Sequence, residues 1–435
     1  MTTMMRQFVV LTSLVGLSLG AYAQQDICSG VSTNAITGRN DCSNPNVITT
    51  AVPFLTIAPD SRSGAMGDAG AGLSPDANSQ HWNASKLAFA EKDMEVSLSY
   101  SPWLRNLVND MHMAYLAGYK KLDKRSALGV SLRYFNLGNI QFTNDVGQEI
   151  RDFKPNEFAF DVSYSLLLSD RFSGGITARY INSNLTGGVM VGGADSRAGQ
   201  AFAVDVSVFY MNDDIRVGDM PATFAMGAVI SNIGNKMAYT NTADRDFIPI
   251  NLRLGPAFTV EIDRYNKFTA AVDFNKLLVP SPPLYNPQTG EVAAGLDPDV
   301  GVATGIIQSF YDAPGDPVRD DDGNPVFNED GTVQIRPGTV FREELREITI
   351  GGGLEYSYAD QFFVRAGYFH EHATKGNRKF ITAGVGVAFS MFAIDFSYIA
   401  AVNRINPLAN TLRFSLRLRF DDLKNAGRTR EIAPD

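Results

Sequence analysis

The segment Leu412-Arg-Phe-Ser-Leu-Arg-Leu-Arg-Phe420 alternates apolar and polar residues along its whole length. Its odd-numbered members are Arg or Ser, and its even-numbered members are Leu or Phe. A period of two gives a β-strand one apolar face and one polar face. The same alternation recurs upstream in Phe158–Leu166, Phe202–Tyr210, Phe268–Asn275 and Phe392–Tyr398. The pattern therefore predicts an all-β fold.

The number and length of the strands indicate what kind of β-fold this is. A soluble sandwich would show the same alternation, but its strands usually have five or six residues. Most strands here supply about 9–11 residues, the length that a tilted strand needs to cross a bilayer. The count is even, as in single-chain bacterial membrane barrels. We count fourteen strands, which start near Glu95, Met111, Leu128, Glu157, Ser173, Ala201, Thr223, Ile250, Lys267, Glu347, Gln361, Lys379, Met391 and Asn410.

The connections between these strands alternate in length. Those after strands 3, 5, 7 and 9 are long. Those after strands 2, 4, 8, 10 and 12 are short, namely Lys121–Arg125, Ser169–Arg171, Asp263–Asn266, Ala359–Asp360 and Ser390. Short periplasmic turns and long outer loops are typical of outer-membrane barrels. Only Met211–Ala222 is longer than this rule expects. We therefore predict a 14-stranded antiparallel transmembrane β-barrel over residues 94–420, with both termini in the periplasm and a C-terminal tail at 421–435.

Aromatic residues gather near the strand ends, where membrane barrels carry interfacial girdles. Ordinary strand aromatics would explain each residue singly, but they explain the clustering less well. The residues are Tyr100, Trp103, Tyr134, Phe135, Tyr210, Tyr358, Phe362, Phe363, Tyr368, Phe369 and Phe420.

The segment Phe54–Phe89 is the only long stretch after the N-terminal leader that reads neither as a strand nor as an outer loop. It is rich in Gly and Ala between residues 64 and 72, and Pro59 and Pro75 prevent one continuous helix. Ser63–Asp68 is expected to form one or two short helical turns. We predict that residues 24–93 form an N-terminal segment whose second part is a hatch, or plug, inside the barrel.

The first 23 residues match a secretory signal peptide. Arg6 gives a positive start, Phe8–Gly20 is an apolar run too short to span a membrane, and Ala21-Tyr22-Ala23 is a small-x-small cleavage site. The two cysteines, Cys28 and Cys42, follow on the exported side. An oxidising compartment favours a disulfide between them, and two free thiols are the alternative.

The largest interruption of the strand pattern is residues 279–340, between strands 9 and 10. It contains nine prolines and the acidic run Asp320–Asp322. Proline density argues against regular structure, whereas the length argues for a functional outer loop. The insertion is therefore expected to cap the pore or meet a partner, with a disordered surface loop as the alternative.

Charged residues on the polar strand faces are expected to point into the barrel lumen. Opposite charges on neighbouring strands, such as Arg253 and Asp273, would pair there and hold a plug. A satisfied lumen network is our main interpretation, and a path for solutes or ions is the other. The candidates are Arg133, Asp161, Arg179, Asp205, Arg253, Asp273, Arg365, Asp395, Arg413, Arg417 and Arg419.

Other patterns give little support for chemistry. The net charge is −9 without a basic cluster, which argues against nucleic acid as a partner. His370-Glu371-His372 places two imidazoles on one face but has no evident third metal ligand. Asp60, Asp68 and Asp76 lack calcium-loop spacing and are expected to be turn and cap residues. No G-x-S-x-G motif is present. We expect neither a cofactor nor an enzymatic activity.

Three motifs carry a resemblance to a known family. Ile57-Ala-Pro-Asp-Ser-Arg-Ser-Gly-Ala-Met-Gly-Asp68, Ser74-Pro-Asp-Ala-Asn-Ser79 and His81-Trp-Asn-Ala-Ser85 resemble the PorV (LptO) family of the Bacteroidetes type IX secretion system. The preceding Thr49–Leu55 fits as well, and the likeness extends over essentially the whole mature chain. The sister family PorQ shares parts of it. The resemblance implies a FadL-type barrel of fourteen strands with an N-terminal hatch.

The resemblance also implies a non-enzymatic role in secretion. Such proteins bind the large translocon barrel, receive cargo that carries a C-terminal sorting domain, and pass it to a sortase-like attachment protein at the surface. Outer-membrane lipid and lipopolysaccharide would surround the barrel. Two alternatives are a FadL-type channel for hydrophobic solutes and a lipid-modifying protein, since the LptO name reflects a link to lipid A deacylation.

Overall fold

The computed structural model describes residues 46–103, 110–143, 149–188, 195–240, 245–321, 324–401 and 411–420. The expected signal peptide, Cys28, Cys42 and the tail at 421–435 lie outside the described residues. Within the described part, no helix has the length and apolar character that crossing a membrane requires.

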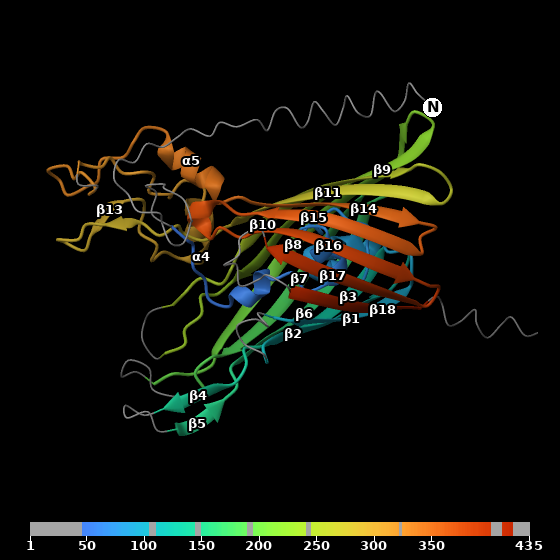
Figure 1. Cartoon of the computed structure of the whole chain (residues 1–435), viewed down its shortest axis with the longest axis horizontal. Coiled ribbons are helices and arrows are strands. Elements are labelled where there is room, and N and C mark those ends of the chain that lie inside the picture. Colours follow the sequence, from blue (N-terminus) through green and yellow to red (C-terminus); the bar gives the residue numbers. More distant parts are fainter. Residues whose placement is uncertain are drawn as a thin grey trace, which may run out of the picture. The chain divides into compact units, whose positions relative to one another are not determined.

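Fourteen strands form a closed antiparallel barrel, which confirms the predicted fold (Figure 1). Closure joins the first and last strands, because Met94 pairs with Phe420 and Tyr100 pairs with Phe414. Every strand pairs with its neighbour along the chain. The strands are β1 (Met94–Pro102), β2 (His112–Lys121), β3 (Ser126–Asn136), β6 (Asn156–Ser169), β7 (Phe172–Asn184), β8 (Gly199–Val217), β9 (Met220–Gly234), β10 (Asn251–Glu261), β11 (Asn266–Leu277), β14 (Thr349–Tyr358), β15 (Phe362–His370), β16 (Lys379–Ala388), β17 (Phe392–Ala401) and β18 (Thr411–Phe420).

The apolar strand faces point outward, as the alternation predicts for a barrel in lipid. In β18, Leu416 is 40% exposed whereas its neighbour Arg417 is 3% exposed. A water-soluble barrel would bury such residues, since apolar area exposed to water is costly. The outward apolar face therefore fits a bilayer as the surrounding solvent.

The aromatic girdle includes fewer residues than the sequence suggested. Tyr134 and Tyr368 face outward, but their neighbours Phe135 and Phe369 are buried inside the barrel, as is Trp103. Successive side chains of a strand point to opposite faces, so two adjacent aromatics cannot both reach lipid. Outward aromatics at strand ends also include Tyr100, Tyr358 and Phe362.

The link at Met211–Ala222 proves to be a tight turn. Strands β8 and β9 extend beyond the predicted ends, and Val217 pairs with Met220 across Gly218, which has a φ of 64°. Register shifts at Asn212–Ile215 mark a bulge in the extension. All short links therefore lie at one end of the barrel, and the long-link rule has no exception there.

The hatch consists of short elements inside the barrel (Figure 1). They are η1 (Pro53–Thr56), α2 (Ser61–Ala65), α3 (Ser79–Trp82) and η2 (Ala84–Phe89). Asp60 caps α2, because its carboxylate accepts a hydrogen bond from the Ser63 backbone N–H at 2.9 Å. A short helix is therefore present, but it spans Ser61–Ala65 and begins two residues before the expected Ser63–Asp68.

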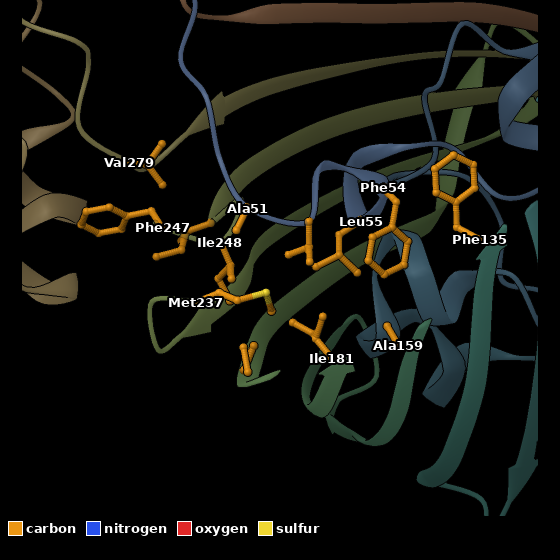
Figure 2. Packing of buried hydrophobic residues seen from close by; sticks show 14 of the residues in the cluster. Ala51, Phe54, Leu55, Phe135, Ala159, Ile181, Met237, Phe247, Ile248 and Val279 are labelled. Atoms are coloured by element: carbon orange, nitrogen blue, oxygen red, sulfur yellow. The ribbon is translucent and has the colours of Figure 1, made fainter. Parts of the chain in front are cut away.

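A hydrophobic cluster fills the end of the barrel at which the long links lie (Figure 2). Phe54 and Leu55 of the hatch pack with Phe135 of β3, Ile181 of β7 and Ile248 of the β9–β10 link. We call this set, with the other members of the same cluster, the mouth cluster. It joins the hatch, the barrel wall and the long connections in one core.

The insertion at residues 279–340 contains regular structure, contrary to the expectation from its prolines. It holds a small sheet of β12 (Leu284–Tyr285) and β13 (Val292–Ala294), helix α4 (Val302–Gln308) and the start of α5 (Thr339–Arg346). Its strands pair with each other and not with the barrel. Another long link carries a second small sheet, β4 (Ile140–Thr143) and β5 (Glu149–Phe153).

Candidate functional site

The hatch is tied to strands around the barrel wall. The Gly67 backbone N–H donates to Thr382 Oγ1 of β16 at 3.0 Å, and the Thr382 hydroxyl donates to the Ala65 carbonyl at 2.8 Å. On the other side, Ser173 Oγ of β7 donates to the Ser85 carbonyl at 2.7 Å. These contacts make the hatch a packed plug within the described part of the chain.

One glycine shows how closely the hatch approaches the wall. Gly67 has a φ of +70°, and a Cβ atom added there would lie 2.5 Å from the carbonyl oxygens of Gly352 and Tyr368. Only glycine combines that backbone angle with that proximity at low cost. The small-residue run of the hatch is therefore explained by contact between backbones.

Six charged side chains form a closed ring of alternating sign inside the lumen, which we call the charge ring. The hatch contributes Arg62 and Asp76, and the wall contributes the other four members. Each arginine touches two carboxylates and each carboxylate touches two arginines, so the charges balance. In order around the ring they are Arg62, Glu355, Arg365, Asp395, Arg417 and Asp76.

The wall side of the charge ring is the tighter side. Arg365 Nε lies 2.6 Å from Glu355 Oε2, and Arg365 Nη1 lies 2.6 Å from Asp395 Oδ1. Arg417 Nη2 lies 2.9 Å from Asp395 Oδ2. Gly386 stands between β15 and β17, where an added Cβ would lie 2.3 Å from Asp395 Oδ1. The absence of a side chain there lets Arg365 reach across β16.

The hatch side of the charge ring is longer. Arg62 bridges Asp76 and Glu355 at 3.2 Å each, and Arg417 Nη1 lies 3.4 Å from Asp76 Oδ2. Glu95 lies beside the ring, 3.9 Å from Arg417 and 3.4 Å from Arg419. Arginine suits this role because its planar fork donates to two carboxylates at once and remains charged when buried.

A second buried group joins β6, β7 and β8. Arg179 Nε lies 2.7 Å from Asp161 Oδ1, directly across the strand pair, and Arg179 Nη2 lies 3.0 Å from Asp205 Oδ2. Asn232 of β9 accepts a hydrogen bond from Arg179 and donates its backbone N–H to Asp205 at 2.7 Å. This group consists of wall residues alone and stiffens that side of the barrel.

The remaining lumen candidates contact the hatch directly. Asp273 Oδ2 accepts from the backbone N–H groups of Gly70 and Ala71 at 2.8 and 3.0 Å, while Arg253 Nε lies 3.9 Å from the same oxygen. Arg133 Nη1 donates to the Leu55 carbonyl at 2.9 Å, and Arg413 Nη1 lies 3.3 Å from Asp68. The structure thus places the predicted lumen charges against the plug or against one another.

The charge ring and the adjacent Glu95 include four residues that were not among the lumen candidates predicted from the sequence. Glu95 and Glu355 occupy polar-face positions of their strands, so the period of two was the signal that could have found them. Arg62 and Asp76 lie in the hatch, where no periodicity indicates which side chains meet the wall. His370 ends β15 with Nδ1 3.4 Å from the Tyr368 hydroxyl, whereas His372 accepts from the Thr374 backbone N–H at the start of η3 (Ala373–Lys375).

A separate ionic cluster attaches the insertion to the rim, and we call it the lysine clamp. Lys276 Nζ of β11 lies 2.9 Å from Glu344 and 2.6 Å from Glu347. Lys375 Nζ of η3 lies 2.8 Å from Glu343 and 3.0 Å from Glu347. All five side chains are buried. The clamp therefore fixes α5 to two different parts of the barrel rim.

Neutral donors and one further acid complete the lysine clamp. Ser281 Oγ donates to Glu347 at 2.7 Å, and Asn46 Nδ2 donates to Glu343 at 2.9 Å. Burial raises the pKa of the Asp312 carboxyl to about 6, with one of its oxygens accepting from the Ser281 N–H at 3.1 Å. Burial also raises the pKa of Glu343, but Lys375 outweighs it and leaves that pKa below its usual value.

Asn46 places the start of the described chain at the rim with the long links. Its backbone N–H donates to the Thr374 carbonyl at 2.8 Å, and its side chain reaches α5. Phe420, at the end of β18, pairs with Met94 at the opposite end of the barrel. Residues 46–93 therefore run through the lumen from the long-link end to the short-turn end.

The chain is similar to several solved structures, each at low sequence identity. The toluene transporter TbuX of Ralstonia pickettii shares 11% identity, with 83% of this chain and 98% of that chain covered and a TM-score of 0.42. The toluene transporter TodX of P. putida shares 11% identity, with 83% of this chain and 98% of that chain covered and a TM-score of 0.43. A Pseudomonas aeruginosa FadL homologue shares 12% identity, with 87% of this chain and 99% of that chain covered and a TM-score of 0.39. No curated protein matches the chain.

One family model matches residues 40–284, which is more than half of the 435-residue chain. Its description is type IX secretion system protein PorV. The match contains the hatch and the first nine barrel strands. The chain belongs to the PorV family of outer-membrane proteins of the type IX secretion system.

Proposed function

We propose that this protein is a binding and transfer component of the secretion system. It binds the large translocon barrel, receives cargo through its C-terminal sorting domain, and hands that cargo to the sortase-like attachment protein. The family membership supports a place in the system. No enzymatic step is part of the proposal.

The observation that carries the proposal is the contrast between a filled lumen and a structured rim. The hatch is hydrogen-bonded to strands around the wall, and the mouth cluster lies at the end of the barrel with the long links. This supports a role in which partners bind at the rim, in preference to the alternative of solute passage. The insertion supports it further, because the lysine clamp holds it in one place on the barrel.

The rim also offers surfaces that suit a β-rich cargo domain. The insertion carries a two-stranded sheet and exposes Tyr285, Phe310 and Tyr311. Aromatic side chains are enriched at protein interfaces, and short sheet edges accept an added strand. We therefore place cargo docking on the insertion.

The proposed orientation has the insertion outside the cell and the short turns in the periplasm. It rests on the length rule for the links, and it puts Phe420 and the tail at 421–435 in the periplasm. It also puts Asn46, where the described part of the chain begins, at the outer end. A maleimide label should reach a Glu329→Cys variant on intact cells but not a Lys124→Cys variant, and the reverse would overturn this orientation.

The test of function is to replace residues 282–337 with a short Gly/Ser linker. Barrel assembly should persist, because β12 and β13 do not pair with the barrel strands. Helix α5 is retained together with its ion pairs to Lys276 and Lys375. Cargo with sorting domains should then remain unsecreted or unprocessed, while uptake of hydrophobic solutes is unchanged. Normal secretion and surface attachment in this variant would show that docking takes place elsewhere.

A further inference from the structure

Helix α5 has its polar and apolar faces reversed relative to an ordinary surface helix. Its acids Glu343 and Glu344 are buried against the rim, whereas Phe341 is 70% exposed and Leu345 is 52% exposed. Phe341 and Leu345 are four residues apart and so lie on one side of the helix. A helix packed on a protein core in water would place these residues the other way round.

The lysine clamp prevents α5 from turning this apolar side inward. Lys276 and Lys375 hold the opposite side of the helix through Glu343, Glu344 and Glu347. Rotation about the helix axis would leave buried carboxylates without their partners, which is costly. The exposure of Phe341 and Leu345 is therefore a fixed property of the docked helix.

The apolar side of α5 continues into the lipid-facing side of the barrel. Strand β14 begins three residues after α5, and its residue Ile350 is 39% exposed on the outward face, followed by Leu354. Figure 1 shows α5 beside the end of the barrel wall formed by β11, β14 and β15. The outward faces of these strands are the surface that meets lipid.

Two arginines flank this apolar side. Arg342 is exposed, and Arg346 is partly exposed with its guanidinium 4.0 Å from Asp316. Apolar residues at the membrane interface with arginines beside them are typical of helices that lie on an anionic lipid surface. Continuity with the lipid-facing barrel and this charge pattern both indicate the same occupant.

We propose that α5 is an interfacial anchor, with Phe341 and Leu345 in the headgroup region of the leaflet on the long-link side. Arg342 and Arg346 face the lipid phosphates. The anchor ties the insertion to the membrane surface as the lysine clamp ties it to the rim. The insertion then has two attachments, one to protein and one to lipid. This assignment does not depend on the proposed role in cargo transfer.

The experiment places a fluorescent reporter on α5 of the full-length protein in lipid vesicles. A Phe341→Trp variant is compared with Phe202→Trp on the lipid face of β8 and with Ile307→Trp on α4. The native Trp82 and Trp103 are buried, and the parent protein supplies their signal for subtraction. Folding of each variant is checked by heat-modifiable gel mobility.

The vesicles contain phosphatidylglycerol and a lipid that carries a spin label at acyl carbon 5 or carbon 12. Emission of Phe341→Trp should fall by at least about twofold with the carbon-5 label and less with the carbon-12 label. Phe202→Trp should respond to both labels, and Ile307→Trp should respond only to acrylamide in the water.

Two outcomes would overturn the anchor. One is acrylamide quenching of Phe341→Trp equal to that of Ile307→Trp, without any effect of the lipid labels. The other is protection of Phe341→Trp in native membranes but not in vesicles, which would show that a protein covers α5. An Arg342→Gln variant tests the contribution of charge, since the carbon-5 effect should weaken in anionic phosphatidylglycerol and stay constant in phosphatidylcholine, which is zwitterionic and has no net charge.

Discussion

The charge ring and the lysine clamp both bury ion pairs between separate segments, but they use different cations. The charge ring has three arginines and three carboxylates in a closed circuit. The lysine clamp has two lysines against three glutamates, with Asp312 nearby. The first joins the hatch to the wall, and the second joins the insertion to the rim.

The choice of cation predicts that the hatch and the insertion differ in how firmly they are attached to the barrel. Arginine stays charged in any burial and holds two carboxylates in a fixed geometry, so the charge ring suits a plug that stays in place. Lysine is a point charge, and the surplus of acids around it leaves the clamp sensitive to proton concentration. We infer that the hatch is a permanent part of the barrel and that the insertion is attached more weakly.

The largest effect should come from breaking the charge ring. An Asp395→Asn variant removes the carboxylate that Arg365 and Arg417 share, which leaves buried positive charge uncompensated. We expect a loss of about 3 kcal/mol or more in the free energy of unfolding. Urea unfolding in lipid vesicles, followed by gel mobility, measures it.

A matched control for Asp395→Asn is Asp360→Asn. Asp360 pairs with Lys267 at 3.0 Å in the exposed short turn after β14. Exposed pairs contribute about 0–1 kcal/mol, so this variant should unfold near the parent midpoint. Equal midpoints for the two variants would show that the ring contributes no more than a surface pair.

The second effect tests whether backbone contact also distinguishes the hatch from the insertion. Gly67 and Gly290 both have φ near +70°, but only Gly67 has backbone atoms within 3 Å of an added Cβ. Gly290→Ala should cost about 1 kcal/mol from its backbone angle alone. Gly67→Ala should cost at least about 2 kcal/mol more, because the wall must move. The same urea titration compares them, and similar costs would mean that the wall yields easily.

The barrel was predictable from sequence because lipid outside and a plug inside impose opposite demands on alternate residues. Leu416 on the outside and Arg417 on the inside are an example. The start of each strand could be predicted from the residue at which the alternation begins. The same rule identified Arg365, Asp395 and Arg417 as lumen residues. It could not say that Arg62 and Asp76 complete their ring, since a short irregular segment has no period.

The insertion shows where the sequence signal ends. The number of prolines reports only on the local backbone. Helix α5 is stabilised by ion pairs between its acids and lysines of β11 and η3, which are distant in sequence. The turn at Gly218 was missed for a similar reason, because a bulged extension of β8 lacks strict alternation.

The third effect should follow from weakening the lysine clamp. Lys375→Met removes a cation between Glu343 and Glu347 while keeping most of the side-chain length. We expect docking of α5 to weaken by about 1–3 kcal/mol, less than for the charge ring, because Glu347 keeps Lys276 and Glu343 keeps Asn46 as a partner. Hydrogen exchange should speed up in α5 and the segment around Ser281 but not in β15 or β17. Faster exchange throughout the barrel would contradict the idea that the insertion is a separate unit.

The smallest effect concerns the pH dependence of docking, which the Asp312 carboxyl governs at neutral pH. Its pKa is raised to about 6 in the docked state from 3.8, so the docked state binds more protons than the released state between these values. The Asp312 contribution to docking stability is therefore fully present below about pH 4 and is lost as the pH rises through 6. Glu343 acts in the opposite sense, because its pKa is lowered in the docked state. Its contribution to docking is present when the pH is above the usual pKa of a glutamate and is lost as the pH falls.

An Asp312→Asn variant separates these two contributions. Between pH 5.0 and 7.5 the parent should lose on the order of 1 kcal/mol of docking stability, after allowance for water at the rim, and the variant should lose almost none. Protection of α5 against hydrogen exchange, corrected for the intrinsic pH dependence of exchange, measures both. The strands that carry the charge ring supply the internal reference, and protection in β15 and β17 should stay constant. If the variant and the parent change equally with pH, another group governs the clamp. If β15 and β17 also change, the hatch and the insertion do not differ in the way that their cations suggest.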